Sequence, residues 1–207
     1  MTHQAVPDST RDRIVAAATA EFARHGIAGA RIARIAKGAK TSTERVYAYF
    51  AGGKDDLYRS VATQELAAIA EATRLDPTDL PGYAGRLFDY YTAHPERYRL
   101  TAWSRLELGD AERDADDPMR KSAARKTEQV RQAQQAGLVD PAWDPMDILV
   151  IVSQIAMTWA NLPDIPIPDG MDRDTFLAAR REAIITAVER LFPTTPARET
   201  DGTTCPC

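Results

Sequence analysis

The sequence of 207 residues predicts an all-α protein with about nine helices. Apolar residues recur every three or four positions along most of the chain, which is the spacing of one helix face. Glycine, proline and helix-capping residues separate these periodic segments. No segment alternates apolar and polar residues as a half-buried strand does.

The first sixty residues predict three helices in quick succession. The first covers 11–26 and ends at Gly26, and its cap is one of three adjacent residues, Asp8, Ser9 and Thr10. Two shorter helices follow at 31–38 and 41–50. A helix, a short helix, a tight turn and another short helix form the helix-turn-helix plan, which places its last helix in the major groove of DNA.

The third helix has one apolar side and one side suited to base contacts. At about 100° per residue, Val46 and Phe50 share the inner side. The outer side and its flanks carry Glu44, Arg45, Tyr47, Ala48 and Tyr49. Arginine binds the O6 and N7 atoms of guanine, glutamate accepts from cytosine N4, and tyrosine hydroxyls reach phosphates.

Some of these residues also have a structural interpretation. Thr41 and Glu44 have the spacing of a capping box, and Ser42 is a competing cap. Glu44 is therefore either a cap partner or a base contact, and Tyr47 is either a phosphate contact or a half-buried packing residue. Few structural roles would explain Arg45 on an exposed face, so it is the leading DNA-binding candidate.

Charge is distributed unevenly along the chain. The net charge is −4, but residues 1–60 carry +4 and residues 61–207 carry −8. Between 23 and 54 there are seven basic residues and one acid, Glu44. Such a local basic patch is typical of a phosphate-binding face, although a solvated surface is the alternative.

The motifs of this region are similar to those of the TetR family of bacterial transcriptional regulators, over roughly residues 10–60. The matching positions are Phe22, Gly26, Ile35, Ala36, Tyr47, Phe50, Lys54, Asp55 and Leu57. The resemblance implies a dimeric DNA-binding repressor with a C-terminal ligand-binding and dimerisation domain. Together with the outer face of the third helix, it predicts DNA contacts by Arg31, Thr41, Ser42, Thr43, Glu44, Arg45, Tyr47, Tyr49 and Lys54.

The sequence departs from the family pattern at three places. Lys40 stands where the turn usually has glycine, so the turn needs another way to reach its conformation. Ala30 and Arg31 replace the usual Ser or Thr at the start of the second helix, which removes a cap, and Arg31 is expected to supply the phosphate contact. The turn before Lys54 is one residue longer than usual.

The rest of the chain predicts a larger helical bundle. Its expected helices are 55–74, 83–94, one from Pro95 onward, 119–136, 147–162 and 174–192. The domains are therefore a helix-turn-helix domain at 10–54, a ligand-binding and dimerisation domain at 55–192, and a disordered tail at 193–207.

Two of these helices are candidates for a homodimer interface. The segment 147–162 is apolar nearly all round, and 174–192 has two apolar edges, so each can face its own core and a partner. A single large monomer core is the alternative. A dimer would read a palindromic operator with half-sites about 34–36 Å apart, or a multiple of that spacing.

Aromatic residues in the middle helices indicate a small-molecule site. A mostly apolar cavity is the usual form of such a site, and the resemblance implies that an inducer binds in this region. The expected lining residues are Phe88, Tyr91, Trp103, Met157 and Trp159, although aromatic residues at helical spacing also serve as ordinary core.

Other function classes have little support in the sequence. It lacks the common metal-hydrolase, nucleophile-elbow and phosphate-loop motifs, so we expect no enzyme, cofactor or metal site. Its only cysteines are Cys205 and Cys207, no signal peptide is evident, and its longest apolar run is too short to span a membrane, so a cytoplasmic protein is expected. A helical protein-interaction module, or a constitutive regulator without a ligand, remains the alternative.

Overall fold

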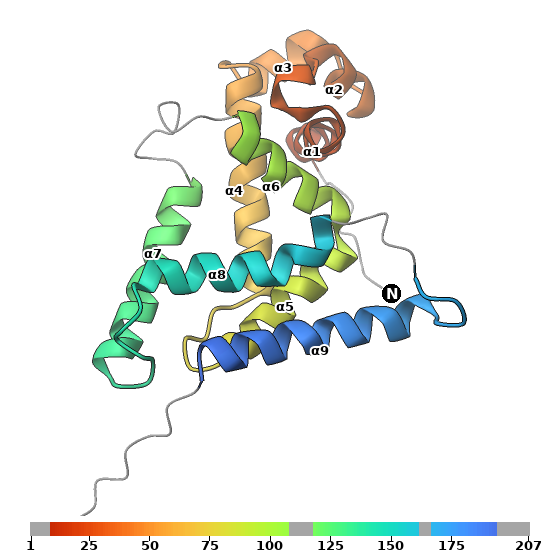
Figure 1. Cartoon of the computed structure of the whole chain (residues 1–207). Coiled ribbons are helices and arrows are strands. Elements are labelled where there is room, and N and C mark those ends of the chain that lie inside the picture. The colour runs from red at the N-terminus through yellow and green to blue at the C-terminus, as the bar shows by residue number, and fades with distance from the viewer. Residues whose placement is uncertain (1–8, 108–117, 162–166, 194–207) are drawn as a thin grey trace, which may run out of the picture. The chain divides into compact units, whose positions relative to one another are not determined.

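The structure, a computed structural model, describes residues 9–107, 118–161 and 167–193. Every regular element in these ranges is helical, which confirms the all-α prediction (Figure 1). The elements are α1 (Thr10–Gly29), α2 (Ile32–Gly38), α3 (Thr43–Tyr49), α4 (Lys54–Ala72), α5 (Leu80–Ala93), α6 (Pro95–Glu107), α7 (Pro118–Gln135), α8 (Pro145–Met157), the 3-10 helix η2 (Thr158–Asn161) and α9 (Arg173–Leu191). Apart from Pro193, the predicted tail lies outside the described residues.

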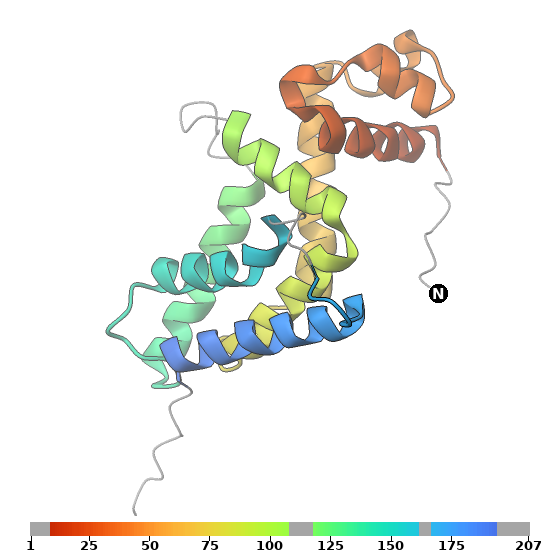
Figure 2. The same ribbon diagram turned by 45° about the vertical axis from the view of Figure 1, so that its right-hand side comes forward.

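The chain divides into two compact units that interleave along the sequence. The first unit contains residues 1–74 and 89–123, and the second contains 75–88 and 124–207. Two of the three divisions fall inside α5 and α7, which are continuous helices (Figure 2). Each unit is therefore built from segments far apart in the sequence.

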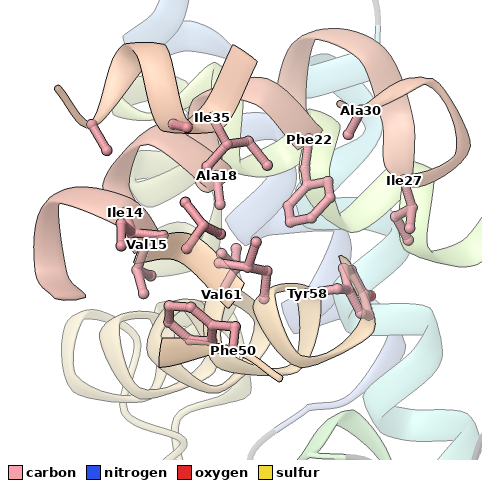
Figure 3. Close-up of a cluster of buried hydrophobic side chains, with 14 of the residues drawn as sticks. Ile14, Val15, Ala18, Phe22, Ile27, Ala30, Ile35, Phe50, Tyr58 and Val61 are labelled. Atoms are coloured by element: carbon pink, nitrogen blue, oxygen red, sulfur yellow. The ribbon is translucent and has the colours of Figure 1, made fainter. Parts of the chain in front are cut away.

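The first unit has one apolar core to which five helices contribute. Phe22 of α1 and Tyr58 of α4 meet edge to face, with ring centroids 5.9 Å apart (Figure 3). Leu100 of α6 is buried in the same cluster. The side chains that are completely buried there are Ile14, Ala18, Phe22, Ile35, Val46, Leu57 and Val61.

α3 is held in place by this core. It is only seven residues long, and isolated helices shorter than about 12 residues are marginal in water. Val46 and Phe50, one helical turn apart, are both buried, as the sequence predicts. Their burial fixes the helix with its opposite side outward.

The caps show where four of the helices begin. Each cap side chain accepts a hydrogen bond from a backbone N–H in the first turn of its helix, and these residues are Ser9, Ser42, Asp144 and Asp172. The capping box of Thr41 with Glu44 is therefore wrong. The Thr41 N–H bonds to the Ala36 carbonyl, so the backbone of Thr41 still belongs to the end of α2.

Several predicted helix boundaries need correction; the helix expected at 83–94, for example, begins at Leu80. Gly26 does not end the first helix but kinks it, with φ 71° and ψ 177°, and helical structure continues to Gly29. The helix expected at 147–162 begins at Pro145 and gives way after Met157 to η2. The tighter 3-10 turn is a common way for an α-helix to end.

Lys40 occupies the glycine position of a Schellman motif at the end of α2. The Thr41 N–H bonds to the Ala36 carbonyl at 3.0 Å, and the Lys40 N–H bonds to the Lys37 carbonyl at 3.2 Å. Lys40 has φ 53°, in the left-handed region. The turn therefore keeps the geometry of a glycine turn, at a conformational cost of about 1–2 kcal/mol for a residue with a Cβ.

The second unit is built around the apolar sides of α8 and α9. Ile148, Val152 and Ala156 of α8 and Val188 of α9 are completely buried, and Ile184 of α9 is almost so. Beyond the end of α9, Phe192 meets Trp143 edge to face with centroids 5.1 Å apart. None of the helices in the described part of the chain is long and apolar enough to cross a membrane.

Replacing Lys40 tests the cost of the left-handed turn. We expect Lys40→Gly to be more stable than Lys40→Ala by about 1 kcal/mol, because both remove the charge but only glycine relieves the Cβ strain. Urea denaturation of the two variants measures the difference. Equal stability would show that the turn carries no strain.

Candidate DNA-binding interface

The face of α3 opposite the core lies in solvent. Arg45 and Glu44 are exposed, and Tyr47 and Tyr49 remain about half exposed, at 48% and 43%. Thr43 is partly exposed at the first position of the helix. The predicted base-reading residues therefore share one accessible surface on a helix fixed from behind.

Ser42 and Glu44 order the N-terminus of α3. The Ser42 hydroxyl oxygen accepts a hydrogen bond from the Arg45 N–H at 3.2 Å. The Glu44 carboxylate accepts from its own backbone N–H and from the Ser42 hydroxyl, and these hydrogen bonds hold the pKa of Glu44 below its usual range. Glu44 is thus ionised at neutral pH, with the acceptor chemistry for cytosine, and its bond to Ser42 supports the cap there rather than a capping box with Thr41.

The turn before α4 brings Tyr47 against a glycine. A Cβ on Gly53 would lie 3.2 Å from Tyr47 Cε1, and Gly53 has φ 63°, so both the space and the backbone favour glycine there. Lys54 follows as the first residue of α4, and its ammonium group donates to the Ala28 carbonyl at 3.1 Å. Tyr47 is therefore both packed on one edge and accessible.

Glu21 of α1 replaces the cap that α2 lacks. Its carboxylate accepts from the Arg31 N–H at 3.1 Å and from Arg34 Nε at 2.6 Å, while Arg34 also donates to the Gly29 carbonyl. Burial acts to raise the pKa of Glu21, which is only 10% exposed, but the Arg34 and Arg31 hydrogen bonds outweigh it and lower the pKa. The side chain of Arg31 stays exposed at the start of α2.

One cation near α3 was missed by the sequence reasoning. The guanidinium of Arg11, in the first turn of α1, lies 5.3 Å from the centroid of the Phe50 ring. Arg11 is exposed and adds positive charge beside the end of α3. No local pattern reveals this neighbour, because the contact exists only once α1 and α3 have packed.

The predicted ligand-lining residues lie in both units. Phe88 and Met157 are buried in the second unit, where Trp159 meets Phe176 edge to face with centroids 5.9 Å apart. Tyr91 is buried in the first unit, to which Trp103 also belongs. Their role in ligand binding stays a prediction.

Comparison with known families agrees with the geometry. The model described as "Bacterial regulatory proteins, tetR family" matches residues 14–61, and that described as "Tetracyclin repressor-like, C-terminal domain" matches residues 79–190. The chain belongs to the TetR family. It is a DNA-binding transcriptional regulator, as the motifs from Phe22 to Leu57 predict.

Two similar proteins come from Streptomyces coelicolor. The HTH-type transcriptional repressor SCO4008 of Streptomyces coelicolor is 42% identical over 154 residues, which cover 74% of this chain and 79% of that protein. The crystal structure of SCO4942, a candidate regulator from the same organism, is 54% identical with a TM-score of 0.77, covering 90% of this chain and 100% of that one.

A more distant TetR-like structure shares the fold alone. The fatty acid degradation regulator FadR of Bacillus halodurans is 19% identical with a TM-score of 0.62, covering 86% of this chain and 93% of that one.

Glu21 should stabilise this TetR-family fold in a pH-dependent way. Because its pKa is lowered on folding, its contribution is present above its unfolded pKa and is lost as the pH falls through its folded pKa. We expect Glu21→Gln to lower the free energy of unfolding by about 1–3 kcal/mol at pH 7, and the deficit to shrink below about pH 4.

The matched control for Glu21 is Glu128→Gln. Glu128 is half exposed and pairs with Arg131 on the same helix, so its loss should change stability by at most about 1 kcal/mol. Urea denaturation at several pH values measures both variants. A Glu21→Gln deficit that does not depend on pH would contradict the capping role.

Arg45 should carry sequence discrimination by this regulator. We expect Arg45→Ala to weaken binding to a duplex that the unaltered chain selects from a randomised DNA library by about tenfold or more, because one good arginine–guanine pair contributes about 1–3 kcal/mol. Arg99→Ala removes an exposed arginine from α6 and serves as the control. Fluorescence anisotropy with labelled duplexes measures both, and equal affinities would contradict the base-reading role.

Proposed function

We propose that the chain is a homodimeric repressor that binds a palindromic operator and is released by a small-molecule effector. In this proposal residues 10–54 bind the DNA, and residues 55–192 bind the effector and form the dimer. Transcriptional regulation is the function of the family, and the proposal includes no enzymatic step. The observation that carries the dimer is an apolar surface on α8 and α9.

That surface lies outside the core of the second unit. Val150, in the middle of α8, is 49% exposed although it is an aliphatic side chain. Met146 stands one turn before it, and Leu191 is exposed at the end of α9. α8 and α9 are neighbours, exposed apolar residues on neighbouring elements are typical of interaction sites, and identical surfaces on two chains form a two-fold interface.

Repression and release would follow from the dimer. Two copies of α3 at a fixed separation bind successive major grooves, so an effector that favours another separation lowers DNA affinity by its differential affinity for the two states. Apolar and aromatic compounds that release the operator would identify the effector class. DNA affinity insensitive to all of them would favour the constitutive regulator instead.

The alternative of a helical protein-interaction module makes a different prediction. Such a module would explain the apolar surface of α8 and α9, but it needs no exposed arginine on α3. Arg45→Ala would then have no effect on nucleic-acid binding. The basic residues around α3 therefore favour the repressor.

Placing a charge on α8 tests the dimer directly. We expect Val150→Glu to convert dimers to monomers, and to weaken binding to a palindromic duplex by about 100-fold or more through loss of the second linked contact. Leu106→Glu is the control, since Leu106 is an exposed apolar residue of α6 in the other unit. Sedimentation equilibrium measures the mass, and a Val150→Glu variant that stays dimeric would contradict the interface.

A further inference from the structure

A lysine and a tyrosine form a polar pair inside the second unit. The ammonium group of Lys126, on α7, donates a hydrogen bond to the Tyr83 hydroxyl on α5, with Nζ and Oη 2.9 Å apart. The same nitrogen lies 5.3 Å from the centroid of the Tyr83 ring. Tyr83 is only 1% exposed and Lys126 is partly buried. The pair therefore places a positive charge against the interior.

The charge of Lys126 has no anionic partner among the residues that the structure describes. The charged groups acting on the pair are arginines: Arg125 on Lys126, and Arg86 on Tyr83. Burial, aided by Arg125, lowers the pKa of Lys126. A partly buried ammonium without a counter-ion is costly, because desolvation is not offset by an ion pair.

Tyr83 does not supply the missing negative charge. Burial raises the pKa of Tyr83 to about 12, against the opposing effect of Arg86, so the phenol stays neutral. Its oxygen accepts from Lys126, and its own O–H has no acceptor in the described residues. Beyond the hydrogen bond between them, Lys126 and Tyr83 thus offer donors at one point for which the described residues supply no acceptor.

We propose that Lys126 and Tyr83 bind the carboxylate of an apolar acid that acts as the effector, an inference that rests on the proposed ligand-released repressor. A carboxylate matches the charge of the Lys126 ammonium and can accept from both donors. A phosphate group carries about −1.5 to −2 charges at neutral pH, which one ammonium leaves uncompensated.

The surroundings of the pair suit an apolar body on that acid. Leu87 lies one helical turn beyond Tyr83 on α5, and Val130 lies one turn beyond Lys126 on α7. Both are buried apolar residues, and residues four apart share a helix face. Thr127, next to Lys126, is buried with its hydroxyl 3.8 Å from the Met146 sulfur.

Matched acids and esters test the proposal on the full chain. The probes are benzoate, phenylacetate and decanoate, each paired with its methyl ester, and calorimetric titration measures their affinities. We expect at least one acid to bind about tenfold or more tightly than its ester, since a charge-assisted hydrogen bond is involved. Lys126→Met should abolish that preference, and Tyr83→Phe should reduce it.

The variants have an independent stability readout. Without ligand, Lys126→Met should melt at a higher temperature than the natural chain, because it removes a charge that burial disfavours. Arg125→Met is the control: it removes the neighbouring exposed charge of α7 and should keep the preference for acids. This pattern is one that a purely structural lysine would not produce.

Three results would overturn the proposal. They are the failure of every acid to bind, equal binding of acids and esters, and a preference for acids that survives Lys126→Met. The proposed ligand-released repressor would be refuted by a different result, which is operator binding that none of the compounds weakens. Release of the operator by an uncharged compound alone, to which Lys126→Met responds as the unaltered chain does, would support the proposed repressor. The same result would refute the carboxylate site.

Discussion

The burial of Val46 and Phe50 is the contact on which the DNA-binding surface depends. α3 is too short to be stable alone, so its position comes from the core that α1, α2, α4 and α6 share with it. With those two side chains inside, Arg45 and its neighbours must face solvent. The proposed DNA contacts on α3 depend on this fixed orientation rather than on the number of basic residues in the region.

The sequence was sufficient for the features that depend on local spacing. Periodicity predicted the buried side of α3, and local chemistry placed Ser42 among the candidate caps of that helix. It was insufficient where two distant segments meet. Glu21 caps α2 from ten residues away, Arg11 lies over Phe50, and Leu100 joins a core formed mainly by the first sixty residues. Such contacts follow from packing, which no window of local sequence encodes.

Two departures from the family pattern are accommodated by different physical means. Lys40 adopts the left-handed conformation itself, so the backbone hydrogen bonds of the turn survive at the cost of strain. At the start of α2 the missing cap is supplied by another helix, through the Glu21 carboxylate. The second unit also carries an energetic cost, which is the desolvation of a charged group. The ammonium of Lys126 lies against the buried ring of Tyr83 without a counter-ion among the described residues. In all three places a polar group is positioned by the surrounding fold.

The most direct test of the account is selection of bound duplexes from a randomised DNA library by the full chain, followed by titration of the selected sequence at several salt concentrations. The account predicts an inverted repeat with half-sites about 34–36 Å apart, or a multiple of that spacing, and an affinity that falls steeply with salt as phosphate contacts are lost. Weak binding that is indifferent to sequence would contradict the claim that the exposed face of α3 reads DNA.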